Sequence, residues 1–263
     1  MSNQVTQQQV NPNHPTITAS SLIRLTGLCA VVAGIVFAGI QPIHPDDVVA
    51  SVNTPAWAII TSLKTIMCVL LLLSIVGLYA RQIKQTGWLG LAGFLLFGLS
   101  WTIQTAFVFA EAFIMPPLAS VAPKFVDGFL GASFGRFSEA NLGILAQLYG
   151  LIVGGGYILG GLLFGIAIFR AGVLSRWPAG LLAATAALTP LAGLAPHAIQ
   201  RLAAMPMGLA LAWLGYALWS ERHEHASEPS PVLANPQLSQ NPSHESRPNG
   251  EAWTGSDITG FPR

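Results

Sequence analysis

Six apolar segments constrain what this chain can fold into more than any other feature of its sequence. They run from Leu22 to Gln41, Ala56 to Ala80, Trp88 to Met115, Gly143 to Phe169, Pro178 to Ala195, and Ile199 to Trp219. A helix needs about 20 mostly apolar residues to cross a hydrocarbon layer of about 30 Å, and its backbone polar groups must be bonded within the helix. We therefore expect an all-α membrane protein, folded as a bundle of six transmembrane helices.

The composition agrees with a membrane protein and separates the middle of the chain from its ends. Only 12 Lys plus Arg and 11 Asp plus Glu occur in 263 residues, of which 52% are hydrophobic, and so few charges are unusual for a soluble domain. Residues 1–20 are rich in Gln and Asn, and residues 221–263 are rich in Pro and Ser. Such segments cannot bury a core. We expect a disordered polar tail over 1–20, a transmembrane domain over 21–220 and a disordered cytoplasmic tail over 221–263.

Basic residues indicate the orientation, because Lys and Arg gather in short cytoplasmic loops. One side of the predicted helices is flanked by Arg24, Arg81, Lys84, Arg170, Arg176 and Arg222. The other side holds Lys124, Arg136 and Arg201, two of them in a longer loop where the rule has less weight. Both termini are therefore expected in the cytoplasm. Because no basic residue precedes the first apolar segment, we expect no cleaved signal peptide.

Gly, aromatic and Arg residues recur at the ends of the predicted helices in three stretches, "GLYARQIKQTGWLGLAGFLLFG", "EAFIMPPLA" and "FRAGVLSRWPAGLL". These stretches resemble a group of small bacterial multi-pass integral membrane proteins of unassigned function. The resemblance extends from Leu22 to Trp219 and implies a location in the bacterial inner (plasma) membrane. It assigns no catalytic residue to this chain.

Polar residues form a stripe on each of two predicted helices. Ser100, Gln104 and Glu111 lie within about 40° of one another at 100° per residue, and Thr61 and Lys64 belong to a similar stripe on the preceding helix. With the orientation above, Lys64 lies about 6 Å below Glu111 along the membrane normal. Ionisable groups in hydrocarbon are costly and point to function. Three interpretations of Lys64 stay open: an anchor that extends to the water, a structural ion pair, and a substrate or proton site.

The outer ends of other helices add charged residues near that position. The loop "QPIHPDD" offers His44, Asp46 and Asp47, while His197 and Arg201 are four residues apart and share a helix face. We expect pairing of Arg201 with an acid and no metal, because the candidate ligands come from separate elements without a fixed spacing. The expected outward-facing polar pocket consists of Lys64, Glu111, Gln104, Ser100, Thr61, His197, Arg201 and Asp46.

Two further patterns bear on function. Glycines crowd the fourth helix at spacings of four, which favours close packing against another helix, first of all the Ala-rich fifth. "GASFG", residues 131–135, has the G-x-S-x-G form of a hydrolase elbow at Ser133, but the strand and helix that this motif requires are missing.

We expect the protein to bind or pass a small solute or ion through the pocket. The alternatives are a non-catalytic partner subunit that packs through Gly and Ala faces, and a membrane-embedded hydrolase, so enzymatic activity stays open. The expected partners are the lipid bilayer, the small solute or ion, and a second membrane protein or another copy of the chain. The sequence has no signature of a cofactor and no basic run for nucleic acid.

Overall fold

The computed structural model describes residues 18–133, 136 and 140–227, and in this part of the chain every regular element is a helix. The elements are α1 (Ala19–Ile40), η1 (Gln41–Ile43), α2 (Val49–Val52), α3 (Pro55–Phe109), η2 (Ala110–Ile114), α4 (Met115–Val121), α5 (Pro123–Ala132), α6 (Leu145–Leu148), η3 (Tyr149–Gly154), α7 (Gly155–Ala171), α8 (Arg176–Ala192) and α9 (His197–Ser227). The expected all-α fold is confirmed.

Four stretches of helix in the described residues are long and apolar enough to cross a membrane. They are Ala19–Ile43, Pro55–Val121, Leu145–Ala171 and Ile199–Ser220. Large apolar side chains lie exposed on the outer faces of these helices, Ile59 by 67%, Ile35 by 58% and Leu209 by 52%. Exposed apolar surface of this extent is typical of helices that face lipid. The predicted tails lie mainly outside the described residues, although α9 continues past the expected boundary to Ser227.

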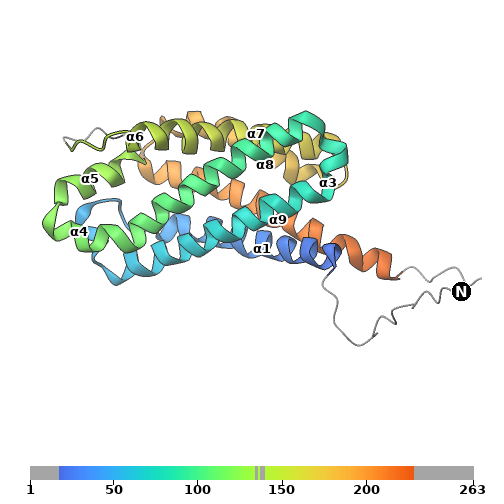
Figure 1. Ribbon diagram of the computed structural model, residues 1–263, viewed down its shortest axis with the longest axis horizontal. Helices are drawn as coiled ribbons and strands as arrows, with labels where there is room; N and C mark the ends of the chain where they lie inside the picture. The colour runs from blue at the N-terminus through green and yellow to red at the C-terminus, as the bar shows by residue number, and fades with distance from the viewer. Residues whose placement is uncertain (1–17, 134–135, 137–139, 228–263) are drawn as a thin grey trace, which may run out of the picture. The chain divides into compact units, whose positions relative to one another are not determined.

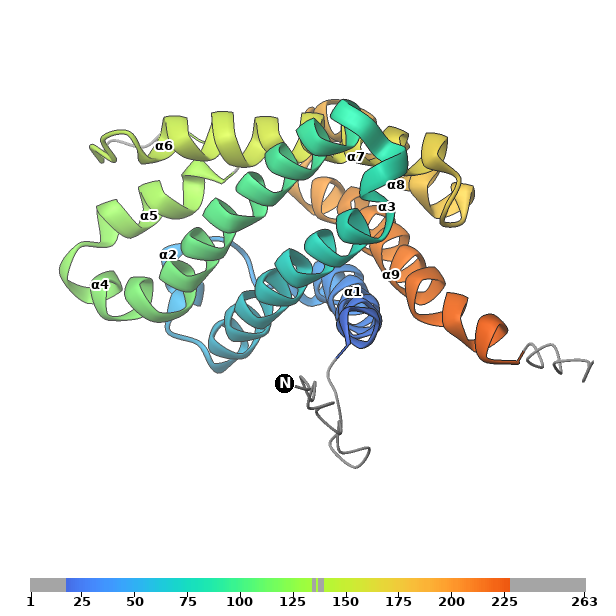
Figure 2. The same ribbon diagram turned by 45° about the vertical axis from the view of Figure 1, so that its right-hand side comes forward.

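The longest helix, α3, consists of two antiparallel arms. Its backbone leaves the helical region at Gln82 (φ −132°, ψ 21°) and again at Gly87 (φ 56°, ψ −154°), where the positive φ favours glycine. The chain reverses there (Figure 2), so that Tyr79 on the first arm stacks on Phe94 on the second with ring centroids 4.4 Å apart. The arms correspond to the second and third predicted segments.

Small residues let the long helices approach closely. Helix α3 packs on α1 and on α7, and α7 packs on α8 (Figure 1). A Cβ placed on Gly34 of α1 would lie 2.4 Å from the carbonyl oxygen of Gly208 on α9, and one on Gly165 of α7 would lie 2.7 Å from the backbone nitrogen of Ala183 on α8. The expected contact between the fourth and fifth predicted helices is therefore present. Both of these glycines therefore pack against helices of the same chain.

The end of the bundle that carries α2, α4 and α5 has a small core of its own. Its buried side chains are Val52, Trp57, Phe107, Met115, Ala119, Val126, Phe129 and Leu130. Helices α4 and α5 form much of the connection between the third and fourth predicted segments. At the opposite end, Trp88 and Trp177 are 85% and 79% exposed, a position typical of residues in a membrane interface.

Two π-helical turns interrupt the helices on either side of the bundle's interior. Turn η2 contains Glu111, and turn η3 covers residues 149–154. A π-turn bonds residue i to i+5 and is often found at functional sites. In each of these two turns, a side chain from another segment donates to a backbone carbonyl. The Trp57 Nε1–H donates to the Glu111 carbonyl oxygen of η2 at 3.0 Å, and the Ser100 hydroxyl donates to the Val153 carbonyl oxygen of η3 at 2.8 Å.

Candidate functional site

A cavity of about 330 Å³ lies where both π-turns face the interior of the bundle. Residues from α1, the loop that follows it, both arms of α3, both π-turns, α7, α8 and α9 line it. Its polar lining includes His44, Asp47, Lys64, Gln104, Glu111, Tyr149 and Arg201, and its apolar lining includes Phe37, Ile40, Met67, Trp101, Val108, Val153, Tyr157 and Ile158. A cavity of this size is at the lower end of the range for small-molecule sites.

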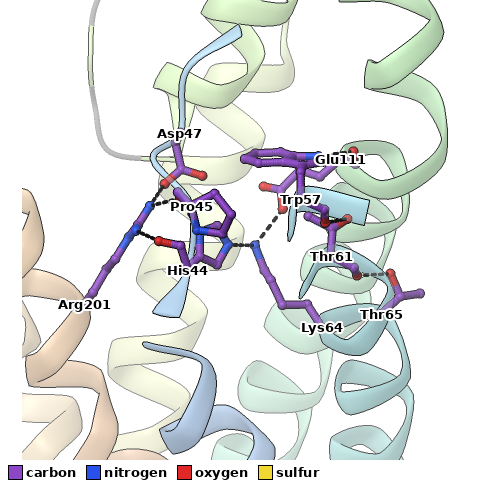
Figure 3. A network of polar contacts seen from close by, with 9 residues as sticks. All are labelled: His44, Pro45, Asp47, Trp57, Thr61, Lys64, Thr65, Glu111 and Arg201. Carbon is purple, nitrogen blue, oxygen red and sulfur yellow. Dashed lines mark hydrogen bonds and ion pairs between the residues drawn. The ribbon is translucent and has the colours of Figure 1, made fainter. Parts of the chain in front are cut away.

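Lys64, on the first arm of α3, and Glu111, in turn η2, form an ion pair. The Lys64 Nζ lies 2.7 Å from Glu111 Oε2, and their side chains are only 14% and 5% exposed (Figure 3). Thr61, one turn before Lys64, donates to the Trp57 carbonyl oxygen at 2.7 Å, so it satisfies its hydroxyl within the helix. Of the three interpretations left open by the sequence, this geometry disagrees with an anchor that extends to the water, because both groups are buried and joined. It is compatible with a structural ion pair and with a substrate or proton site.

His44 extends this pair toward the first loop. Its Nε2 lies 3.1 Å from the Lys64 Nζ, and its Nδ1 lies 2.7 Å from the Pro45 carbonyl oxygen. A protonated lysine can only donate, so Nε2 must accept and Nδ1 must carry the proton that it donates to Pro45. Burial, and secondarily the charge of Lys64, lowers the pKa of His44 to about 4. The imidazole is therefore neutral at pH 7.

Arg201 fastens the same loop to α9. Its guanidinium donates to the His44 carbonyl oxygen at 2.8 Å, to the Pro45 carbonyl oxygen at 2.9 Å, and to the Asp47 carboxylate (Figure 3). The expected pairing of Arg201 with an acid is present. Its partner is Asp47, whereas Asp46, the residue placed in the pocket from sequence, is exposed and does not line the cavity. The two residues are adjacent, and the turn of the loop directs only the second inward.

The remaining predicted pocket residues differ in their placement. Gln104 lines the cavity. Ser100 and Thr61 are buried but do not line it, because both hydroxyls are bonded to backbone carbonyls. His197 begins α9, but its side chain lies outside the described part of the chain.

Three buried polar atoms of the cavity lining have no hydrogen-bond partner among the described residues. They are Trp101 Nε1, Gln104 Oε1 and Ser133 Oγ. The Tyr149 hydroxyl lies close to Gln104 and Ser133. Sequence reasoning missed Trp101 and Tyr149. Trp101 had a usable signal, because it lies three residues before Gln104 on the same helix face; Tyr149 had none, since its orientation depends on the π-turn.

Hydrolytic and metal chemistry gain no support from this arrangement. Ser133 Oγ lines the cavity without a hydrogen bond to a base, and a serine nucleophile needs such a base to be activated. Within the described residues, no group of three His, Cys, Asp or Glu side chains is arranged to hold a metal ion.

No protein family, curated protein or solved structure matches this chain.

Proposed function

We propose that this chain is a six-span inner-membrane protein that binds a small solute in the central cavity and allows it to pass. The single observation that carries the proposal is the buried network of His44, Asp47, Lys64, Glu111 and Arg201, which forms one wall of a 330 Å³ cavity. Charged side chains inside a membrane protein are costly and concentrate along substrate and ion pathways.

The proposal includes the orientation expected from the basic residues. Both termini are cytoplasmic, the two arms of α3 are separate spans, and α8 completes the count of six. The polar wall then faces the outer side, beneath the small core formed around α4 and α5. The exposed Trp88 and Trp177 lie at the cytoplasmic interface in this orientation, as aromatic anchors do.

A purely structural network is the strongest alternative, and the cavity argues against it. Replacing a buried ion pair by well-packed apolar residues often leaves the stability of the fold unchanged or raises it. A network that only stabilised the fold would therefore not need to line a cavity. Here Lys64, Glu111 and Arg201 all line the cavity, where a solute can reach them.

Chemical labelling from outside the cell tests the proposal without knowledge of the solute. The two native cysteines, Cys29 and Cys68, are buried and are first replaced by Ala. Ala204→Cys then places a thiol on the cavity lining of α9. Leu209→Cys is the matched control on the same helix, at a position that is 52% exposed on the outer face and is covered by lipid in the proposed orientation.

A small, charged, membrane-impermeant methanethiosulfonate should modify Ala204→Cys in intact cells and leave Leu209→Cys unmodified. Labelling of neither thiol, or labelling of Ala204→Cys only in inside-out vesicles, would refute an outward-facing cavity. A reporter enzyme that is active only outside the cytoplasm, fused after Trp219, checks the orientation separately: its activity would place the C-terminus on the wrong side.

A further inference from the structure

The charges around the cavity cancel. Lys64 and Arg201 are paired with Glu111 and Asp47, and the contacts of His44 require its neutral form. The polar wall therefore contributes two positive and two negative groups, each already paired. Among the described residues that line the cavity, no opposite charge is free to receive a ligand charge, and burying an unpaired charge is expensive.

Hydrogen-bonding capacity nevertheless remains at this wall. A lysine ammonium has three donors, and Glu111 and His44 account for two of those on Lys64 within the described residues. Glu111 accepts from Lys64 through Oε2, and its other oxygen has no bond to the described part of the chain. One donor and one acceptor therefore lie beside each other at the edge of the cavity, without a net charge.

Apolar side chains, three of them aromatic, form another part of the cavity lining. Trp101 packs edge-on against Phe37 with ring centroids 5.6 Å apart, and Tyr157 lies 6.2 Å from Trp101. Met67 and Val108 also belong to this apolar lining and are almost fully buried. Such a surface favours an apolar ligand body, in particular a ring, which can make offset or edge contacts with the aromatic side chains.

We infer that the ligand of this cavity is an uncharged amphipathic molecule, with an apolar body beside Trp101 and Phe37 and a hydroxyl or amide head at the Lys64–Glu111 pair. The inference rests on the proposed function and specifies its solute. A volume of about 330 Å³ is equivalent to about eleven water molecules at about 30 Å³ each, which suits a single ring with a short substituent. The unpaired Nε1–H of Trp101 gives a ligand oxygen a second donor after a small movement of the indole.

Four fluorinated probes with the same body separate the possible ligand charges. They are 4-(trifluoromethyl)benzyl alcohol, the corresponding benzoate, the corresponding benzylammonium, and trifluoromethylbenzene, which has no head group. Binding to the full-length protein in lipid nanodiscs is measured by fluorine NMR line broadening, with empty nanodiscs to subtract partitioning into lipid. We expect the alcohol to bind at least about tenfold more tightly than either ion, because each ion carries an unpaired charge into the cavity.

Occlusion of the cavity locates the binding. Ala204→Phe fills part of the space from α9, and Ala192→Leu does so from α8, so one of the two serves if the other fails to fold. Each should weaken binding of the alcohol by at least about tenfold. Leu209→Phe, on the exposed face of α9, is the matched control and should leave binding unchanged.

Equal or tighter binding of the benzoate or the benzylammonium overturns the inference about charge. Equal binding of trifluoromethylbenzene overturns the role of the head group, and binding of the alcohol that survives occlusion shows that it binds elsewhere. Failure of all four probes overturns the proposed ligand size and chemistry. If Ala204→Cys is still labelled from outside in any of these cases, the proposed function stands and only the ligand class is refuted.

Discussion

Removing the Lys64 ammonium tests whether the buried pair behaves as the structure implies. Lys64→Met keeps a long apolar side chain and leaves Glu111, which is 5% exposed at its side chain, without its partner. Breaking a buried ion pair in this way typically costs about 3–5 kcal/mol.

The double variant Lys64→Met/Glu111→Gln isolates the cost of the unpaired carboxylate, because it has no charged group at either position. Unfolding in mixed detergent micelles, followed by tryptophan fluorescence, should show the single variant less stable than the double by about 3–5 kcal/mol at pH 7. A difference below about 0.5 kcal/mol would mean that Glu111 is solvated. The buried pair would then be refuted.

Three further perturbations follow from specific contacts. The pKa of His44 falls from 6.5 to about 4 on folding, so the folded state binds fewer protons than the unfolded state between these pH values. The free energy of unfolding should therefore drop by up to about 1 kcal/mol per pH unit as the pH falls from 6.5 to 4. His44→Gln should make the free energy of unfolding less dependent on pH in this range. Gly34→Ala should destabilise the protein by about 1–3 kcal/mol, because the added Cβ would lie 2.4 Å from a carbonyl oxygen of α9. Gly39→Ala is the control, since a Cβ there would have nothing within 4 Å. It should be neutral or slightly stabilising in the same unfolding assay. Trp57→Phe should cost about 1–3 kcal/mol by leaving a buried π-turn carbonyl unpaired, while Trp177→Phe, at a residue 79% exposed, should have no measurable effect.

The helical segments and the contact between Lys64 and Glu111 could be anticipated from sequence for physical reasons. A membrane-crossing helix has to be long, apolar and internally bonded, so its sequence shows it without reference to tertiary structure. Helical periodicity then places polar residues on faces, and the basic residues place the helices relative to one another in depth. These two rules alone predicted that Lys64 and Glu111 lie close enough to pair.

The inner details of the site could not be anticipated, because they depend on loops and on irregular helix. The choice of Asp47 over Asp46 is made by the turn of a short loop that Arg201 holds through two backbone carbonyls. His44 appeared in the sequence as a possible metal ligand, and only its position between Lys64 and Pro45 reveals a neutral hydrogen-bond bridge. Ser100 pointed to the cavity by periodicity but bonds to a carbonyl of the second π-turn instead.

The two π-turns give the walls of the cavity a way to move that does not require the helices to tilt. A π-turn is a dislocation: it holds one residue more than the α-helix on either side of it, and it can shift along the helix by exchanging one backbone hydrogen bond at a time. Each residue that it passes rotates by about 100° about the helix axis. Glu111 lies in one dislocation, and Tyr149 with Val153 in the other, so a shift of a single residue would turn a cavity-lining side chain inward or outward while the glycine-packed helices keep their places.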